Sequence, residues 1–267
     1  MEKLLAYEEK QITQIEKWKK EKPGLFSVVF GKATNRFSNK IISYLPQAEI
    51  EKAMDFANVM AKKLSDQEDI LTYGGVKEIS ELRTKSLKLS DWLADQVHNW
   101  AIGMAAAEGA VAGAAGLVSI PFDIPVIITL ALRTAYQVGL CYGYDCTSEP
   151  DKNFILGILS ASGANSMKEK STALDTLQAI EVALAKQAWR EVAKEQFGKK
   201  SVVVAVRSLA RQLGVNITRR RMLSAVPAVG AVIGGSFNAW YMKDVGWAAR
   251  RSFQERWLIA NQKIAET

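Results

Sequence analysis

The sequence predicts an all-α protein that forms a single domain over residues 1–267. Apolar residues recur three and four positions apart along most of the chain, which is the spacing of one face of an α-helix. Alternation of apolar and polar residues does not persist long enough for a β-strand, and glycine-rich hairpin turns are missing. No shift in composition marks a domain boundary. With 267 residues, of which 48% are hydrophobic and 24% charged, the chain is long enough to bury a core.

The first predicted element is an amphipathic helix over residues 2–20. It belongs to an N-terminal segment, residues 1–22, that we expect to dock on the rest of the domain. Its apolar face carries Leu5, Ile12, Ile15 and Trp18. Pro23-Gly24 ends it. Because the opening residues contain no continuous apolar stretch, they do not form a secretory signal, and we expect the protein to stay in the cytoplasm.

Three further helical segments are predicted before the centre of the chain. One spans residues 46–64 and has a proline in its first turn. Gly74-Gly75 interrupts the pattern, and a new apolar stripe runs through residues 76–87. Ser90-Asp91 then has the residue types of an N-cap, so we expect it to begin a helix over residues 92–118.

A helical hairpin over residues 100–144 is the centre of the predicted fold. Its first half is rich in small residues, with ten alanines or glycines in residues 105–118, which suits helices whose backbones approach closely. The second half is expected to begin with Asp123 as N-cap and Pro125 in the first turn. The hairpin contains three charged residues, Glu108, Asp123 and Arg133. They must either be buried in pairs or face a ligand or a membrane surface.

The C-terminal half is predicted to continue as helices. A polar turn over residues 145–152 precedes a short helix over residues 153–163, and a longer helix covers residues 171–197. A helix with a basic face follows over residues 201–213. Residues 222–242 are then 21 consecutive uncharged residues, which is long enough to span a membrane.

Small residues make a membrane-spanning role for residues 222–242 the less favoured interpretation. The segment is weakly hydrophobic, and it contains a proline, an asparagine and three glycines. Residues Gly230, Gly234 and Asn238 recur every four positions, as do Ala101, Ala105, Gly109 and Gly113 in the hairpin. We therefore expect segments 100–144 and 222–242 to pack together as a tight pair in the core.

The excess of positive charge is confined to one region. The chain has 35 basic and 28 acidic residues, but residues 199–243 contain eight basic residues and no acidic one. Such a cluster attracts phosphate-bearing partners, and its position beside an apolar segment suits anionic lipid better than nucleic acid. The residues expected to bind lipid or a partner are Arg219, Arg220, Arg221, Lys243, Trp247, Arg250 and Arg251. The alternative is a solvated basic face with ordinary core tryptophans.

The sequence lacks the motifs of the common enzyme classes. It contains no P-loop and no nucleophile elbow, and its single histidine, His98, is expected simply to lie on a helix. The two cysteines, Cys141 and Cys146, are expected to be reduced and at least half-buried, and with one histidine they do not complete a zinc site. We expect neither a metal nor a cofactor.

The three charged residues of the hairpin leave two interpretations open. Glu108 inside an Ala/Gly helix would be costly to bury alone, so a buried ion pair of Glu108 with Arg133 is the first. The second places Glu108 and Asp123 as a carboxylate pair for acid–base or metal chemistry, with Arg133 beside them. Asn238 is expected to form a hydrogen bond between helices.

Two blocks of small residues and prolines form recognisable motifs. The first comprises Glu108, Gly109, Gly113, Gly116, Pro121, Asp123, Pro125, Arg133, Tyr142, Gly143 and Asp145. The second comprises Pro227, Gly230, Ala231, Gly234 and Asn238, followed by Ala249, Phe253 and Arg256. Together with the opening from Tyr7-Glu8 to Trp18, these blocks resemble the signatures of the EcsC family over nearly the whole chain.

The resemblance implies a context and no mechanism. EcsC proteins are known chiefly as neighbours of the ATPase and membrane subunits of a bacterial ABC exporter, and no catalytic residues are carried over. We therefore expect a non-enzymatic accessory protein at the inner face of the cell membrane, which binds anionic lipid or an exporter subunit through its basic C-terminal region. The alternative is a hydrolase for a lipid-like or phosphate-bearing substrate that uses Glu108, Asp123 and Arg133.

Overall fold

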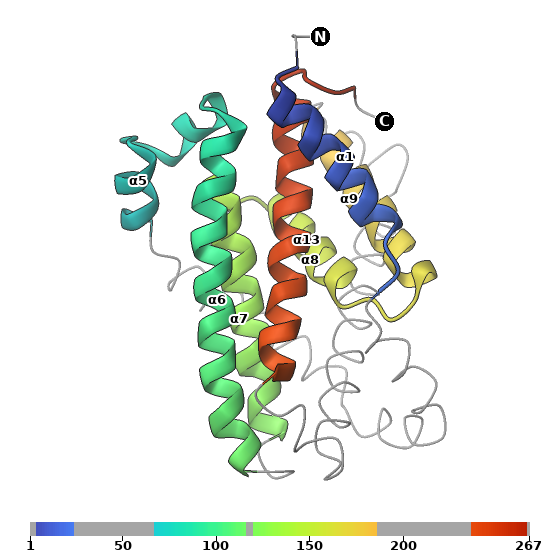
Figure 1. Cartoon of the computed structure of the whole chain (residues 1–267). Coiled ribbons are helices and arrows are strands. Elements are labelled where there is room, and N and C mark those ends of the chain that lie inside the picture. Colours follow the sequence, from blue (N-terminus) through green and yellow to red (C-terminus); the bar gives the residue numbers. More distant parts are fainter. Residues whose placement is uncertain (1–3, 24–66, 116–119, 186–235, 266–267) are drawn as a thin grey trace.

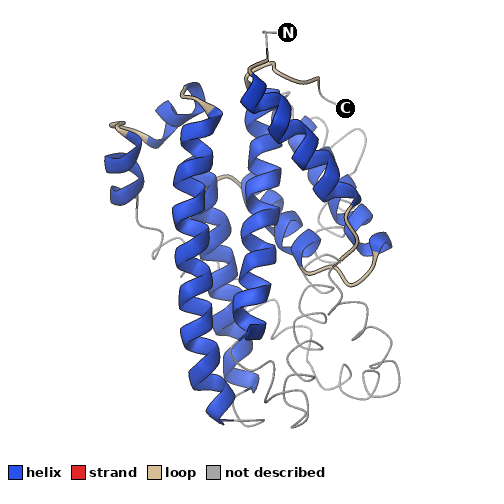
Figure 2. Ribbon diagram, viewed as in Figure 1, coloured by secondary structure: helices blue, strands red, loops and turns tan. Residues whose placement is uncertain are grey.

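The computed structural model describes residues 4–23, 67–115, 120–185 and 236–265, and within these ranges every regular element is a helix (Figures 1 and 2). The predicted all-α class is confirmed. The helices expected over residues 46–64 and 201–213, and residues 222–235 of the uncharged segment, lie outside the described residues. That one domain spans residues 1–267 stays a prediction.

Three long helices form the centre of the molecule. Helices α6 (Leu87–Ala115) and α7 (Ile120–Cys141) run in opposite directions, and α13 (Ser236–Ala260) packs along both of them (Figure 1). Helix α13 also contacts α8 (Glu149–Ser162) and α1 (Ala6–Lys20). The first and last described helices, α1 and α13, therefore pack against each other. Within the described ranges, no helix is both long enough and apolar enough to cross a membrane.

An aromatic cluster fills the core between α7, α8 and α13. Phe253 of α13 is fully buried and contacts the rings of Tyr142, Tyr144 and Phe154, with ring centroids 6.2, 5.8 and 5.3 Å away. Full burial of each such side chain contributes about 1.5–3 kcal/mol to folding. The thiols of Cys141 and Cys146 are free and buried, as the sequence predicted.

Helix α1 packs against α13, although one residue of its expected apolar face points away. Ile15 is buried, and Ile12 and Trp18 pack against the core. Leu5 is 60% exposed, so the prediction was wrong for this residue. An ion pair at 2.5 Å between Lys19 and Glu255 joins α1 to α13 near the end of α1.

Glycines end two helices where the sequence predicted. Helix α5 (Glu68–Gly74) stops at Gly75, whose φ of +61° lies in the left-handed region that glycine adopts without strain. Helix α8 stops at Gly163. The 3₁₀-helix η1 (Ile79–Thr84) follows α5, and α9 (Met167–Ala185) follows α8.

Four helices begin earlier than predicted, namely α6, α7, α8 and α9, the last of which begins at Met167 instead of residue 171. Helix α6 begins at Leu87, where the Ser86 hydroxyl accepts the Leu89 amide at 3.3 Å, so Ser90-Asp91 lies inside the helix and does not cap it. Helix α8 begins at Glu149, since Pro150 fits the first turn and the Ser148 hydroxyl accepts the Asp151 amide at 3.2 Å. The predicted polar turn over residues 145–152 is correspondingly shorter.

Helix α7 begins at Ile120, so the backbone of Asp123 is already helical. The predicted N-cap role of Asp123 is therefore wrong. A proline is tolerated in the first helical turn, which allows the helix to start before Pro121 instead of after it.

Candidate functional site

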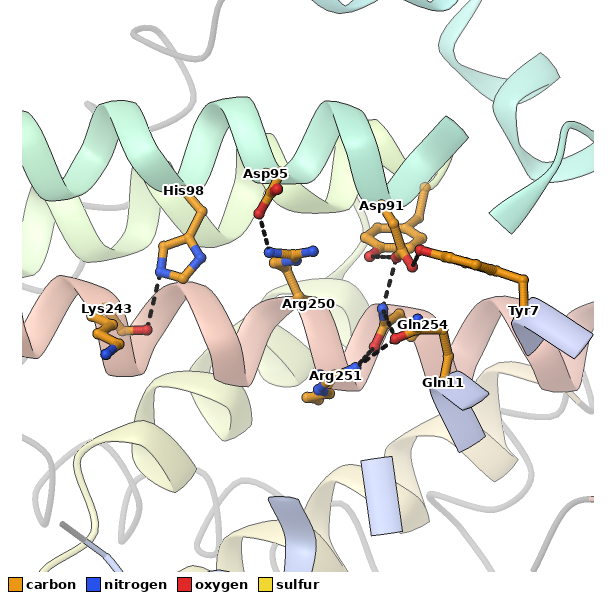
Figure 3. A network of polar contacts seen from close by, with 10 residues as sticks. Tyr7, Gln11, Asp91, Asp95, His98, Lys243, Arg250, Arg251 and Gln254 are labelled. Atoms are coloured by element: carbon orange, nitrogen blue, oxygen red, sulfur yellow. Dashed lines mark hydrogen bonds and ion pairs between the residues drawn. The ribbon is translucent and has the colours of Figure 1, made fainter. Parts of the chain in front are cut away.

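A buried carboxylate, Asp91, joins three helices through hydrogen bonds (Figure 3). Asp91 lies on α6 and is 3% exposed. Its Oδ1 accepts the Tyr142 hydroxyl at 2.5 Å and the Gln254 amide Nε2 at 2.7 Å, while its Oδ2 accepts the Tyr7 hydroxyl at 2.6 Å. Burial and then the Asp91 carboxylate raise the pKa of Tyr7, so its hydroxyl stays a donor at neutral pH. This arrangement fixes α1 to α6 and α13.

Two arginines of α13 extend the same network inside the protein. The Arg251 NH1 group donates to Gln11 Oε1 at 2.9 Å and to Gln254 Oε1 at 2.7 Å, and Arg250 is paired with Asp95 (Figure 3). Both arginine residues are less than 9% exposed. The expectation that Arg250 and Arg251 meet lipid does not agree with this burial, because their guanidinium groups are directed at α1 and α6.

His98 is a core residue on α6 that fits against Gly246 of α13. A Cβ atom at position 246 would lie 2.0 Å from His98 Cδ2. The imidazole Nε2 lies 3.1 Å from the Lys243 carbonyl oxygen, and the ring meets Trp247 edge-on at 5.6 Å. Burial, with a smaller contribution from Arg250, lowers the pKa of His98 to about 4, so the ring is neutral at pH 7. The interpretation of His98 as a structural residue on a helix agrees with this position.

A cleft of about 480 Å³ opens beside the Arg251 end of this network. It lies where the end of α1 and the α8–α9 connection approach α13. Three tryptophans and five basic residues dominate its lining: Trp18, Trp240, Trp247, Lys17, Lys22, Lys170, Lys243 and Arg251. Its acidic lining residues are Glu21 and Asp244. We refer to this cavity as the tryptophan cleft.

Lys170 is built into the wall of the tryptophan cleft. It is 5% exposed, and its Nζ donates to the carbonyl oxygens of Trp18 at 2.5 Å and Glu21 at 2.9 Å. These carbonyls belong to the end of α1, where the helix dipole favours a cation. The Nζ also lies 4.9 Å from the centre of the Trp18 ring. Burial lowers the pKa of Lys170, because the charged form loses water that carbonyl oxygens replace only in part.

The structure separates the residues that the sequence grouped as one binding region. Lys243 is exposed and Trp247 half-buried, and both line the tryptophan cleft. Arg219, Arg220 and Arg221 lie outside the described residues, and Arg250 and Arg251 belong to the buried network. The described part of the small-residue motifs is divided among three helices. Gly109 and Gly113 lie on α6, Pro121 and Pro125 lie on α7, and Asn238 is buried on α13. The other motif residues lie outside the described residues: Gly116, Pro227, Gly230 and Gly234.

Two of the three charged residues of the hairpin, Asp123 and Arg133, lie far apart along α7. The Arg133 guanidinium on α7 lies over the Trp100 ring of α6, 4.5 Å from its centre. Asp123 lies ten residues earlier on the same helix, about 15 Å along its axis. The side chains of Glu108 and Asp123 are outside the described set, so the predicted Glu108–Arg133 pair and the Glu108–Asp123 carboxylate pair stay predictions.

Sequence comparison places this chain among known proteins. The model of the EcsC protein family matches residues 9–258. The uncharacterized protein YdbA of Bacillus subtilis (strain 168) is 22% identical over 96% of this chain and 94% of its own length. Protein EcsC of the same organism is 22% identical over 85% of this chain and 87% of its own length. No solved structure matches the chain.

Proposed function

This chain belongs to the EcsC protein family, and we propose that it is a non-enzymatic accessory protein that binds anionic lipid at the inner face of the cell membrane. The observation that carries the proposal is the position of the charge. Residues 199–243 contain eight basic residues and no acidic residue, while the rest of the chain has 27 basic and 28 acidic residues. A cluster of this size beside an apolar segment is attracted to the negative surface of a cytoplasmic leaflet.

The described end of the basic region supports a surface role. Lys243 is exposed, and the half-buried Trp247 follows it one helical turn later. Tryptophan beside lysine is typical of the boundary between lipid and water, because the ring is amphipathic and the ammonium group reaches the phosphates. The proposed binding residues are therefore Arg219, Arg220, Arg221, Lys243 and Trp247. An acidic surface of an ABC-exporter subunit would be a second target for the same charges.

The enzymatic alternative has less support from the described side chains. A hydrolase would need Arg133 beside the carboxylates of Glu108 and Asp123. The guanidinium group lies over Trp100, and Asp123 is nearly three helical turns from Arg133 on α7. Binding without catalysis is therefore the function that we propose.

Fractionation of bacterial cells that express the chain tests the proposal. We expect the protein to sediment with membranes at low ionic strength and to be released by about 1 M salt, at which the Debye length falls to about 3 Å. Protein that stays in the supernatant at low ionic strength would contradict membrane binding. Protein released only by detergent would contradict binding by surface charge and would point to insertion in the bilayer.

A further inference from the structure

We infer that the tryptophan cleft binds the phosphate-bearing head of a small amphiphile, with Lys17 and Lys243 as the cations that reach the phosphate. The inference rests on the proposed function only for the source of the ligand, which would be a membrane phospholipid. The chemistry of the ligand is argued from the cleft itself. A soluble phosphate ester would present the same anionic group, so the experiment below separates the two sources.

The charge of the lining selects an anion. Five basic residues face two acidic ones, Glu21 and Asp244. Two of the basic residues, Lys170 and Arg251, are more than nine-tenths buried, and within the described part of the chain their hydrogen bonds go to neutral carbonyl and amide oxygens. Neutral oxygens replace lost water without cancelling the charge. Glu21 and Asp244 offset part of the charge of Lys170, but the basic lining residues outnumber the acidic ones, so the cleft keeps a positive potential that an anion would offset.

Two further basic residues of the cleft lining are exposed to solvent. Lys17 and Lys243 are exposed, and among the described residues neither has a carboxylate within ion-pair distance. They come from α1 and α13, so a ligand between them would contact both helices. Ammonium groups on flexible stems suit a phosphate that approaches as a point charge.

The tryptophans indicate that the ligand has an apolar part. Cations hold two of the three indole rings in place, since Lys170 lies 4.9 Å from the centre of the Trp18 ring and Arg251 lies 5.0 Å from that of Trp247. Trp240 is the third aromatic wall. A volume of about 480 Å³ is in the usual range for small-molecule sites and exceeds the size of a phosphate group. A phosphodiester with a glycerol backbone and the first carbons of its chains fits both the charge and the walls.

Titration of the full-length protein with soluble probes, followed by tryptophan emission, tests the cleft. We expect saturable binding of dihexanoyl-phosphatidylglycerol below its micelle concentration and none of dihexanoyl-phosphatidylcholine, whose choline group cancels the charge. The variant Lys17→Glu/Lys243→Glu should bind at least about tenfold more weakly, since two charge-assisted contacts are lost. Lys17→Gln/Lys243→Gln should show a smaller loss in the same direction.

The matched control is Lys10→Glu/Lys88→Glu, because both lysines are exposed and lie outside the cleft lining. It changes the net charge equally and should bind as the wild type does. Equal binding of the two lipids, or equal weakening in both charge-reversed variants, would overturn the inference. Saturable binding of glycerol 3-phosphate or inorganic phosphate with the affinity of the lipid would overturn the amphiphile as the ligand and would point to a soluble phosphate instead.

The outcomes also separate this site from the proposed function. Protein that binds dihexanoyl-phosphatidylglycerol in the cleft but ignores anionic vesicles would contradict the membrane role and keep the site. Protein that binds vesicles but shows no saturable binding of the soluble lipid would keep the membrane role and overturn the site.

Discussion

Replacement of Gly246 by alanine is expected to lower the free energy of unfolding by about 3 kcal/mol, which is the upper end of the usual cost of overpacking a core. The new Cβ would lie 2.0 Å from His98 Cδ2 and 2.5 Å from His98 Cγ, so the imidazole ring could not keep its place. Its displacement would break the contact with the Lys243 carbonyl oxygen and the edge-on contact with Trp247. Urea denaturation followed by circular dichroism measures the loss.

The chain offers a matched control and a rescue for this prediction. An added Cβ at Gly103 of α6 meets nothing within 4 Å, so Gly103→Ala should stabilise the helix by about 0.5–1 kcal/mol. The double variant His98→Ala/Gly246→Ala removes the ring that the new methyl group would strike. It should be less destabilised than the sum of the two single variants. Wild-type stability in Gly246→Ala would contradict the close packing of α6 on α13.

Replacement of Asp91 by alanine is expected to cost about 3 kcal/mol or more, because three donors lose their shared acceptor at once. Tyr142 and Gln254 are fully buried, so water cannot easily replace the carboxylate. The same change should loosen α1, since the Tyr7 hydroxyl loses its partner on α6. Urea denaturation measures the first effect, and the rate of proteolysis within residues 6–20 measures the second.

The control for Asp91 is Tyr7→Phe, which removes one donor from a half-buried position and leaves the carboxylate with two partners. Its expected cost is about 1 kcal/mol. If Asp91→Ala and Tyr7→Phe proved equally mild, Asp91 would not be the centre of the network.

Local patterns in the sequence predicted those parts of the fold that depend on nearby residues. The all-α class follows from helical spacing, and the helix ends at Gly75 and Gly163 follow from glycine. The start of α6 was missed because Ser90-Asp91 has the residue types of an N-cap. The partners that make Asp91 a buried acceptor instead, Tyr7 and Gln254, are 84 and 163 positions away.

The candidate site also depends on contacts between residues that are far apart in the sequence, so local patterns did not predict it. Arg250 and Arg251 stand among tryptophans, a pattern typical of an interface, yet their burial depends on α1 and α6. The tryptophan cleft was not predicted because its two walls, Lys17-Trp18 on α1 and Lys243 to Trp247 on α13, come from opposite ends of the chain. Only the basic character of Lys243 and the aromatic Trp247 were visible locally. The folded arrangement of α1 on α13 is what brings these walls together.

Flotation with vesicles of defined composition tests most directly the claim that a clustered basic region binds anionic lipid. We expect the wild-type protein to float with vesicles that contain phosphatidylglycerol and not with phosphatidylcholine alone, and added salt should release it. Arg219→Ala/Arg220→Ala/Arg221→Ala should weaken flotation, while Asp123→Asn should leave it unchanged. Wild-type protein that stays at the bottom of the gradient with phosphatidylglycerol vesicles at low salt would contradict the proposed function.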